Sequence, residues 1–223
     1  MQTWAIVVAA GSGTRLGLDH PKAFVKLDGR PLLAHSIDLF EDHPAVDRMV
    51  LVVPADWQEP TTLLADDLAA GKVAAAVAGG ETRAHSVAAG LAELPPVAEL
   101  VLVHDAARPL ADAALIDRVL AGIGDADGCI PVVPVTDTVK AVESGQVVET
   151  LDRSRLVAVQ TPQLFVTAAL RTAYERAAGD LAGATDCSSL VEAAGFRVVT
   201  VPGDPRNLKI TDQSDLERAE AMC

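Results

Sequence analysis

Aromatic residues are scarce in this 223-residue chain, which has four Phe, two Trp and one Tyr. Half of the residues are nevertheless apolar and 22% are charged, a composition that excludes a disordered segment and is sufficient for a sizeable core. That core must consist of Val, Leu, Ile and Ala, as in a parallel sheet covered by Ala-rich helices. The length fits one domain that comprises residues 1–223 and includes a local projection better than it fits two full domains.

Basic residues are also few, since 18 Lys and Arg face 31 Asp and Glu and give a formal net charge of −13. This balance argues against a surface for duplex nucleic acid or an anionic membrane, because both are bound by basic clusters. It does not exclude an anionic small molecule, which a few basic residues in one cleft can bind.

Only three cysteines are present, and no Cys-x-x-Cys occurs. Their wide spacing indicates neither a zinc knuckle nor a disulfide framework and favours a reducing compartment. The first apolar stretch, Trp4–Ala10, lacks a basic flank and is too short for a signal sequence or a membrane span. We therefore expect a soluble, cytoplasmic protein.

Short apolar runs alternate with amphipathic stretches, which predicts an α/β fold with a mostly parallel, Rossmann-like sheet and helices on both faces. The expected strands are Trp4–Ala9, Met49–Val53, Val73–Ala78, Leu100–His104, Cys129–Val133 and Arg197–Val201. The expected helices are Pro31–Phe40, Thr82–Glu93, Ala113–Ala121, Thr167–Ala178, Ser188–Ala194 and Ser214–Met222. Thr82 is expected to cap its helix, and Pro31 is expected in the first turn.

The alternation breaks at about residues 136–159. Two β-like segments, Val139–Val142 and Val147–Leu151, flank Ser144-Gly145, a hairpin signal. They contain few large apolar residues, so we expect an arm that projects from the sheet.

The first chemically informative stretch is the glycine loop Gly11–Gly17 after the first strand, followed by Pro21-Lys22. Such a turn can present backbone N–H groups to a phosphate. It is not the dinucleotide fingerprint, because Leu16 stands at the third glycine position, which disfavours a dehydrogenase; it is not a Walker A loop either. Arg15 and Lys22 add two cations, although a plain βα turn with surface cations is an equally good interpretation of this stretch alone.

Two further stretches end predicted strands. Gly79–Ser86 is a glycine turn that opens a helix, and by itself it is more simply explained as a turn and a cap. Val103–Pro109 sets Asp105 at the carboxyl end of a buried strand, where ligands bind in open α/β sheets. One carboxylate together with phosphate oxygens is a usual way to hold Mg²⁺; the alternative is that Asp105 caps the next helix or pairs with Arg108.

Together these stretches resemble one family, the 2-C-methyl-D-erythritol 4-phosphate cytidylyltransferases. The family pattern Ala-Ala-Gly-x-Gly-x-Arg, Pro-Lys, Gly-Gly-x-x-Arg-x-x-Ser and Val-His-Asp-Ala-Ala-Arg-Pro is present at Ala9–Arg15, Pro21-Lys22, Gly79–Ser86 and Val103–Pro109. The resemblance continues in order through Asp137–Lys140, Asp152-Arg153, Gln160–Gln163, Thr185-Asp186 and Asn207–Thr211. It implies a nucleotidyltransferase-type fold that converts CTP and a polyol phosphate into a CDP-alcohol and pyrophosphate.

The resemblance also implies roles for individual residues. Arg15 and Lys22 would stabilise the transition state, and Arg153 and Lys209 would aim the acceptor's phosphate; these four are the expected catalytic residues. Asp105 would hold Mg²⁺ or another divalent cation. The residues expected at the nucleotide are Ala9, Ala10, Gly11, Gly13, Gly80, Glu81, Arg83, Ser86 and Ala106. Those expected at the acceptor are Arg108, Thr138, Thr161 and Thr185. The arm would cross a two-fold homodimer, so that Thr138 and Arg153 enter the partner's site.

One departure from the family pattern concerns Cys187, which stands where relatives usually carry an acid and would make the acceptor pocket less negative. Two other functions remain open from the sequence. A sister cytidylyltransferase for ribitol 5-phosphate shares the glycine loop and Pro-Lys, and a catalytically silent nucleotide-binding subunit could share the fold. The Ala9-Ala10-Gly11 opening and Thr185-Asp186 favour methylerythritol phosphate, and the retained cations argue against a silent subunit.

Overall fold

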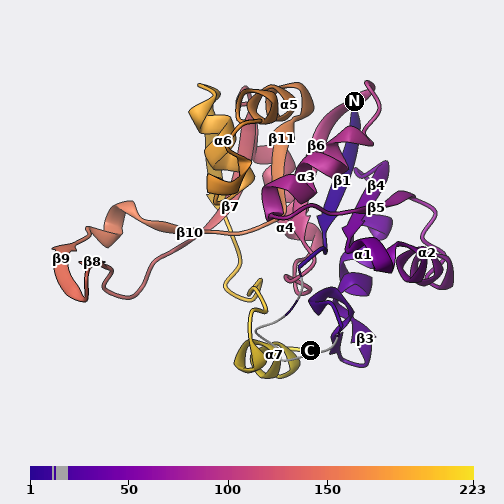
Figure 1. Cartoon of the computed structure of the whole chain (residues 1–223), viewed down its shortest axis with the longest axis horizontal. Helices are drawn as coiled ribbons and strands as arrows, with labels where there is room; N and C mark the ends of the chain where they lie inside the picture. The colour runs from indigo at the N-terminus through magenta and orange to yellow at the C-terminus, as the bar shows by residue number, and fades with distance from the viewer. Residues whose placement is uncertain (12, 14–19) are drawn as a thin grey trace.

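One eight-stranded sheet forms the centre of the molecule, in a computed structural model that describes residues 1–11, 13 and 20–223 (Figure 1). Its strand order is β10-β7-β11-β6-β1-β4-β5, and β12 also pairs with β7. The strands are β1 (Gln2–Val8), β4 (Arg48–Val53), β5 (Val73–Ala78), β6 (Ala98–Asp105), β7 (Gly128–Pro134), β10 (Val157–Val159), β11 (Gln163–Val166) and β12 (Val198–Pro202).

Most of the sheet is parallel, as predicted. β1 pairs in parallel with β4 and β6, β4 with β5, and β7 with β12. β11 lies antiparallel between β6 and β7, and β10 is antiparallel to β7. The sequence did not predict β10 or β11, because three or four residues without a regular alternation give too weak a signal.

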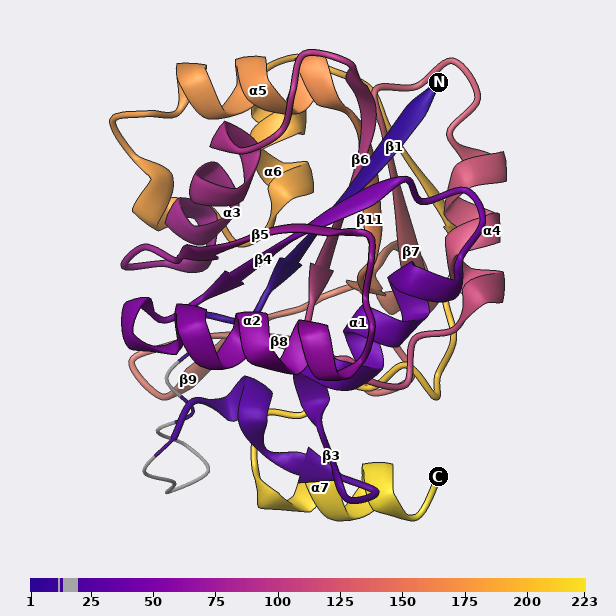
Figure 2. The same ribbon diagram turned by 90° about the vertical axis from the view of Figure 1, so that its right-hand side faces the viewer.

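Helices cover both faces of the sheet (Figure 2). One face packs against α1 (Leu32–Asp42), α2 (Gln58–Asp67) and α4 (Ala113–Gly122), and the other against α3 (Arg83–Ala92), α5 (Thr167–Arg176) and α6 (Cys187–Ala193). Alternation along β1 supplies both cores: Ala5 and Val7 face the first layer, and Trp4 and Ile6 face the second. The α/β prediction is therefore confirmed.

The helix bounds differ from the predicted ones by a few residues. Thr82 does cap α3, accepting a hydrogen bond from the His85 N–H, whereas Pro31 precedes α1 as its N-cap instead of lying in the first turn. α2 was not predicted, since it contains Pro60 and buries only Thr61 and Ala65. In the described part of the chain, no helix is long and apolar enough to cross a membrane.

A small layer lies at the carboxyl end of the central strands. It combines the hairpin β2 (Lys26–Leu27) and β3 (Arg30–Pro31) with the last helix, α7 (Gln213–Glu220). Leu27, Leu32, Ile210 and Leu216 form its core. The described residues also form the short 3-10 helices η2 (Lys22–Phe24), η3 (Ala55–Trp57), η4 (Arg153–Arg155) and η5 (Leu181–Gly183).

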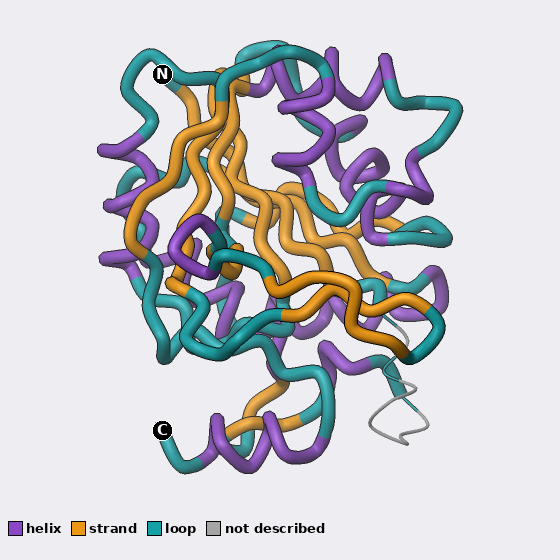
Figure 3. The backbone as a smooth tube through the Cα atoms, turned by 90° about the vertical axis from the view of Figure 1, so that its left-hand side faces the viewer, coloured by secondary structure: helices purple, strands orange, loops and turns teal. Residues whose placement is uncertain are grey.

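The expected arm leaves the sheet between β7 and β10. It contains the two-stranded hairpin of β8 (Lys140–Glu143) and β9 (Gln146–Thr150), which projects away from the body in Figure 1 and lies in front of it in Figure 3. Ser144 and Gly145 form its turn with φ of 48° and 81°, the left-handed conformation that a two-residue hairpin loop requires. Residues 157–159, the last of the range expected for the arm, belong to the sheet edge as β10.

Candidate active site

The predicted loops meet at the carboxyl ends of β1, β5 and β6. Backbone hydrogen bonds continue past the strands: the Ala9 N–H donates to the Val52 carbonyl at 2.7 Å, and the Ala106 N–H donates to the Val8 carbonyl at 3.0 Å. The Gly79 N–H likewise donates to the Val53 carbonyl at 2.8 Å. The sheet itself therefore brings together the three glycine- or acid-bearing stretches, at the edge where open α/β sheets bind ligands.

A first pocket of about 410 Å³ opens between these loops. Its lining comprises Val8, Ala9, Ala10, Gly11, Lys22, Ala23, Gly80, Glu81, Thr82, Arg83, Ser86, Asp105, Ala106, Ala107 and Lys209. All residues expected at the nucleotide are among them except Gly13. The backbone of Gly13 lies against Lys22, since a Cβ on Gly13 would stand 2.9 Å from the backbone nitrogen of Lys22. Arg15 lies outside the described residues.

Glycine is required where the first and second loops touch. A Cβ on Gly79 would stand 2.3 Å from the Cβ of Ala10, closer than two carbon atoms can approach. The hydroxyl of Ser86 fixes the turn, since it accepts from the Gly80 N–H at 3.2 Å and donates to the Thr82 carbonyl at 3.0 Å. The pocket wall is therefore backbone held at close range, a surface suited to a flat base and to phosphates.

A second pocket of about 430 Å³ adjoins the first. Its lining comprises Arg83, Asp105, Arg108, Val159, Gln160, Thr161, Gln163, Thr185, Asp186, Ser188, Ser189, Glu192 and Lys209. Three residues expected at the acceptor, Arg108, Thr161 and Thr185, are part of it. The two arm residues with an expected role, Thr138 and Arg153, line neither pocket of their own chain.

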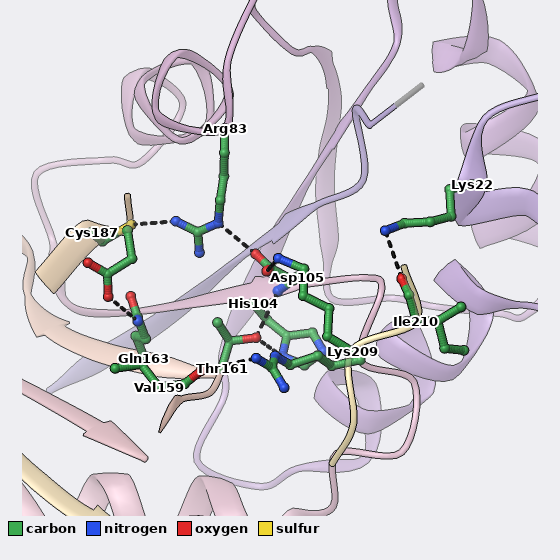
Figure 4. Close-up of polar contacts among 12 residues, drawn as sticks. Lys22, Arg83, His104, Asp105, Val159, Thr161, Gln163, Cys187, Lys209 and Ile210 are labelled. Atoms are coloured by element: carbon green, nitrogen blue, oxygen red, sulfur yellow. Dashed lines mark hydrogen bonds and ion pairs between the residues drawn. The ribbon is translucent and has the colours of Figure 1, made fainter. Parts of the chain in front are cut away.

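Three charged residues line both pockets and form the wall between them (Figure 4). The Asp105 carboxylate accepts from Arg83 Nε at 2.8 Å and from Lys209 Nζ at 2.7 Å, one cation on each oxygen. Burial alone would raise the pKa of Asp105, but Arg83 and Lys209 outweigh it and hold that pKa well below its usual range. The wall thus carries one negative and two positive charges; the alternative pairing of Asp105 with Arg108 is absent from the described contacts.

Arg108 adds a further positive charge to the second pocket. Its Nη1 donates to the Asn207 carbonyl at 2.8 Å and its Nη2 to the Val159 carbonyl at 3.1 Å. Burial lowers its pKa, and its Nε is buried without a hydrogen-bond partner among the described residues. Two carbonyls orient this guanidinium without neutralising it, so it remains attractive to an anion.

Thr161 joins the second pocket to the end of β6. Its hydroxyl accepts from the Asp105 N–H at 3.0 Å and lies 3.2 Å from His104 Nδ1. Burial lowers the pKa of His104 to about 4, so this imidazole is neutral at neutral pH. The Thr161 hydroxyl therefore ties the loop after β10 to the strand that presents Asp105.

Lys22 and Lys209 are connected through the C-terminal segment. Lys22 Nζ donates to the Ile210 carbonyl at 2.8 Å, and the Ile210 N–H donates to the Ala107 carbonyl at 2.8 Å. The segment before α7 thereby brings Lys209 to Asp105 and contacts the first-loop lysine at the same time. Residues that are up to 188 positions apart in the sequence meet in this way at one site.

Comparison with known proteins decides the family. The family model described as 2-C-methyl-D-erythritol 4-phosphate cytidylyltransferase matches residues 3–223. The protein of that name from Rhodococcus jostii is 46% identical over 221 residues, which cover 98% of this chain and 93% of the relative. The chain belongs to the 2-C-methyl-D-erythritol 4-phosphate cytidylyltransferase family.

Solved structures agree with this cytidylyltransferase fold. The 2-C-methyl-D-erythritol 4-phosphate cytidylyltransferase of Thermus thermophilus is 35% identical, with a TM-score of 0.80 over 100% of this chain and 98% of that one. The 4-diphosphocytidyl-2C-methyl-D-erythritol synthase of Anaerococcus prevotii is 30% identical, with a TM-score of 0.86 over 99% and 97%.

Other relatives are longer than this chain. The bifunctional enzyme IspD/IspF of Solidesulfovibrio magneticus is 46% identical over 224 residues, which cover 97% of this chain but 56% of that enzyme. The chain thus spans about half the length of several curated relatives that it matches.

Several residues that line the two pockets, or that contact their walls, were not predicted to take part. Thr82, Ala23 and Ala107 line the first pocket, and Gln160 and Asp186 line the second. All five lie within or beside the quoted sequence stretches, so position alone could have suggested them. Tyr174 contacts Cys187 from α5, and no local sequence signal joins Tyr174 to the site. Cys187, which the sequence placed at the acceptor pocket, lines neither pocket and contacts Arg83 from α6.

Proposed function

We propose that the chain transfers the cytidylyl group of CTP to 2-C-methyl-D-erythritol 4-phosphate, giving 4-diphosphocytidyl-2-C-methyl-D-erythritol and pyrophosphate. Family membership supports the pair of substrates. The observation that carries the proposal is the wall of Arg83, Asp105 and Lys209, which both pockets share. Two anionic substrates placed in the two pockets would meet across that wall.

The first pocket suits the nucleotide. Its glycine turns leave room for a flat base, and backbone N–H groups of such turns can donate hydrogen bonds to a triphosphate. The second suits the acceptor, whose phosphate would face Arg108. An oxygen of that phosphate attacks the α-phosphorus of CTP and pyrophosphate leaves in line. The nucleophile is already ionised, so no strong general base is needed, and catalysis depends on positioning and on charge stabilisation.

If CTP binds in the first pocket, Lys22, Lys209 and Arg83 would face its triphosphate and the negative charge that grows there. All three line the first pocket, and Lys209 and Arg83 also reach the second. We assign the stabilisation of the transition state to them together with Arg15. Arg108 and Thr185 would orient the acceptor, and Thr161 would do so mainly by fixing Asp105.

We also propose that Asp105 holds a divalent cation, Mg²⁺ or a similar ion, together with triphosphate oxygens. No group of three or more His, Cys, Asp or Glu side chains in the described ranges could hold a metal unaided. The donor set fits the ion nonetheless: Asp105 is an ionised carboxylate on the wall of the first pocket, and each of its oxygens, besides accepting from Arg83 or Lys209, keeps a lone pair for an ion. Mg²⁺ is usually bound by one or two carboxylates plus substrate phosphates. When bound, such an ion would neutralise triphosphate charge.

We further propose a homodimer that exchanges its arms. A lone two-stranded hairpin is marginally stable and needs a surface to pack on. The arm exposes Val142, Val147 and Val148 by 56%, 62% and 53% of their area, which a second copy would cover. Thr138 and Arg153 would then complete the partner's second pocket.

The cysteines support a reducing compartment, as expected for the cytoplasm. Cys129, Cys187 and Cys223 are all free, and the first two are buried.

The decisive experiment measures pyrophosphate release with each of CTP, ATP, GTP and UTP against 2-C-methyl-D-erythritol 4-phosphate and ribitol 5-phosphate. We expect release only with CTP and methylerythritol phosphate, with the diphosphocytidyl product identified by its mass. Activity with ribitol 5-phosphate alone would replace the acceptor, and binding of CTP without release with either acceptor would favour a silent subunit.

A further inference from the structure

Gln160 is a buried amide side chain in the wall of the second pocket. The residue follows β10 directly, and its backbone N–H donates to the Pro131 carbonyl of β7 at 2.8 Å. Gln160 is therefore fixed to the sheet. Its side chain reaches the loop of residues 203–207, which follows β12 and contains no helix or strand.

The amide of Gln160 pairs with the backbone of this loop. Its Oε1 accepts from the Asp204 N–H at 3.0 Å, and its Nε2 donates to the Asp204 carbonyl at 2.8 Å. A flipped amide would set N–H against N–H and oxygen against oxygen, so the backbone of Asp204 fixes the orientation of the side chain. A Cβ on Gly203 would stand 2.4 Å from Oε1, which leaves no room between the amide and the loop.

The Asn207 carbonyl connects this pair to Arg108. It accepts from Arg108 Nη1 at 2.8 Å and from Gln160 Nε2 at 3.3 Å. Arg108 Nη2 donates to the carbonyl of Val159, the residue before Gln160. The two carbonyls that orient the guanidinium thus lie on either side of one amide, and that amide sets their spacing.

The far end of the same segment is anchored without Gln160. The Ile210 N–H donates to the Ala107 carbonyl at 2.8 Å, and Lys209 is held by its ion pair in the wall between the pockets. Arg108 lines only the second pocket, whereas Lys209 lines both. A change at Gln160 should therefore disturb the second pocket more than the first.

We propose that Gln160 is a positioning residue for the acceptor: its amide holds the loop of residues 203–207 so that the Asn207 carbonyl orients Arg108 toward the acceptor's phosphate. This inference rests on the proposed function, in which the acceptor occupies the second pocket. It predicts that the amide at position 160 controls the use of the acceptor more than the binding of CTP.

The first test is Q160E, which keeps the shape of the side chain but replaces the donor Nε2 by an oxygen that faces two carbonyls. We expect the KM for methylerythritol phosphate to rise about tenfold and the KM for CTP to stay within about twofold of the parent's. Q58E is the matched control, because Gln58 Nε2 donates to the Ala76 carbonyl at 3.1 Å outside both pockets. Its two KM values should both stay within about twofold of the parent's.

A double-mutant cycle with R108A separates positioning from a general effect on the fold. If Gln160 acts through Arg108, Q160E should change kcat/KM for the acceptor by less than about twofold in the R108A background. A purely structural loss would retain its full effect there. An acceptor KM of Q160E equal to the parent's, or an undiminished effect in R108A, would overturn the inference.

G203A tests the same contact from the loop and decides the matter if Q160E does not fold. The added Cβ would meet the end of the Gln160 side chain at 2.4 Å and the Val132 carbonyl at 3.1 Å, so the amide is the group that must move. We expect the acceptor KM to rise about fivefold in the parent background and by less than about twofold in R108A. An unchanged acceptor KM in G203A would contradict the role of the amide.

The two proposals fail separately. A parent enzyme without cytidylyl transfer contradicts the proposed function, whereas Arg108 can still be followed without turnover. In protein labelled with ¹⁵N-arginine, the Nε–H signal that disappears in R108K should shift in Q160E and in G203A but not in Q58E. A signal that stays the same in Q160E and G203A contradicts the positioning role even in a fully active enzyme.

Discussion

Single residues set the electrostatics of the wall between the pockets. Asp105 sits between Arg83 and Lys209 with 9% of its side chain exposed, and both cations outweigh the cost of its burial. The sequence pointed to Asp105 and the glycine turns because each belongs to a local pattern with a chemical reason, whereas it pointed to Lys209 only through the resemblance to the family. It could not show that Asp105 pairs with Arg83, because that pair depends on where the fold places the first residue of α3 relative to the last residue of β6.

Lys22→Ala should lower kcat by about a hundredfold and should change the KM for CTP much less. The reason is that Lys22 lines the first pocket, where charge grows in the transition state. Steady-state kinetics provides the measurement, with Lys26→Ala, an exposed lysine outside both pockets, as the control. An unchanged kcat with weaker CTP binding would leave Lys22 a role in ground-state binding only.

Asp105→Asn should increase the Mg²⁺ concentration needed for half-maximal activity, and EDTA should stop turnover in the parent. The amide keeps the shape of the carboxylate but not the charge that attracts the ion. Titration of activity with MgCl₂ measures the effect, and Glu99→Gln, an exposed acid outside the site, is the control. Turnover that survives EDTA would contradict the metal assignment.

His104 should make the protein less stable as the pH falls below about 6.5. The native imidazole has a pKa of about 4 while the unfolded chain takes up a proton near 6.5, so the unfolded state binds more protons between these values. The contribution is complete above pH 7.5 and should be smaller by about 2 kcal/mol at pH 5.

Urea titrations of the parent and of His104→Gln at pH 7.5 and pH 5 measure this contribution. The parent should lose about 2 kcal/mol more than the variant between the two pH values. Equal losses would mean that His104 is protonated in the folded protein near its ordinary pKa.

At the level of elements, apolar runs in the sequence predicted most of the long strands, whereas the sequence did not predict which strands pair. The run at Trp4–Ala9 corresponds closely to β1, because a buried parallel strand is continuously apolar. The run at Val73–Ala78 has the bounds of β5, although this strand lies at the edge of the sheet and is mostly half-buried. β11 was not predicted, because only its pairing with β6 and β7 identifies its four residues as a strand. α2 was not predicted either, because it buries few side chains against the sheet.

Gly79→Ala should disturb the contact between the loop after β1 and the turn after β5. The added Cβ would stand 2.3 Å from the Cβ of Ala10 and 2.8 Å from the Ser86 hydroxyl, so the loops must separate. We expect a loss of about 2 kcal/mol in the free energy of unfolding, together with weaker CTP binding by calorimetry.

Gly179→Ala is the matched control, because nothing lies within 4 Å of its Cβ position and the residue is exposed. Its stability should change by less than about 1 kcal/mol and its CTP affinity should not change. Equal behaviour of the two alanine variants would show that the close approach at Gly79 does not shape the pocket.

At the scale of the whole molecule, the arm is the element whose position is not explained by packing against the rest of the chain. Its hairpin pairs with itself, and the Arg153 guanidinium reaches only the Thr136 carbonyl of the same arm among the described contacts. The sequence predicted the projection from the loss of large apolar residues and from the Ser144-Gly145 turn. What the arm contacts in a dimer cannot follow from one chain, because an isologous interface depends on two surfaces meeting about a symmetry axis.

If the arm acts across the dimer, each active site is shared between two subunits. Lys22→Ala and Arg153→Ala should each be nearly inactive as pure proteins. In a mixed dimer whose Arg153 acts in trans, one site carries both lesions and the other carries neither. Random mixing makes about half of the dimers mixed, each with one intact site of two, so the unseparated mixture should recover to roughly a quarter of the parent's activity.

The two variants are co-expressed with different affinity tags, and the mixed dimer is isolated by sequential purification before its activity is measured. Each variant carrying both tags provides the control for the tags themselves. If Arg153 acts within its own subunit, every site in the mixed dimer keeps one lesion and no activity returns. An inactive mixed dimer of verified composition would therefore exclude the shared site, and recovery would locate Arg153 in the site that contains its partner's Lys22.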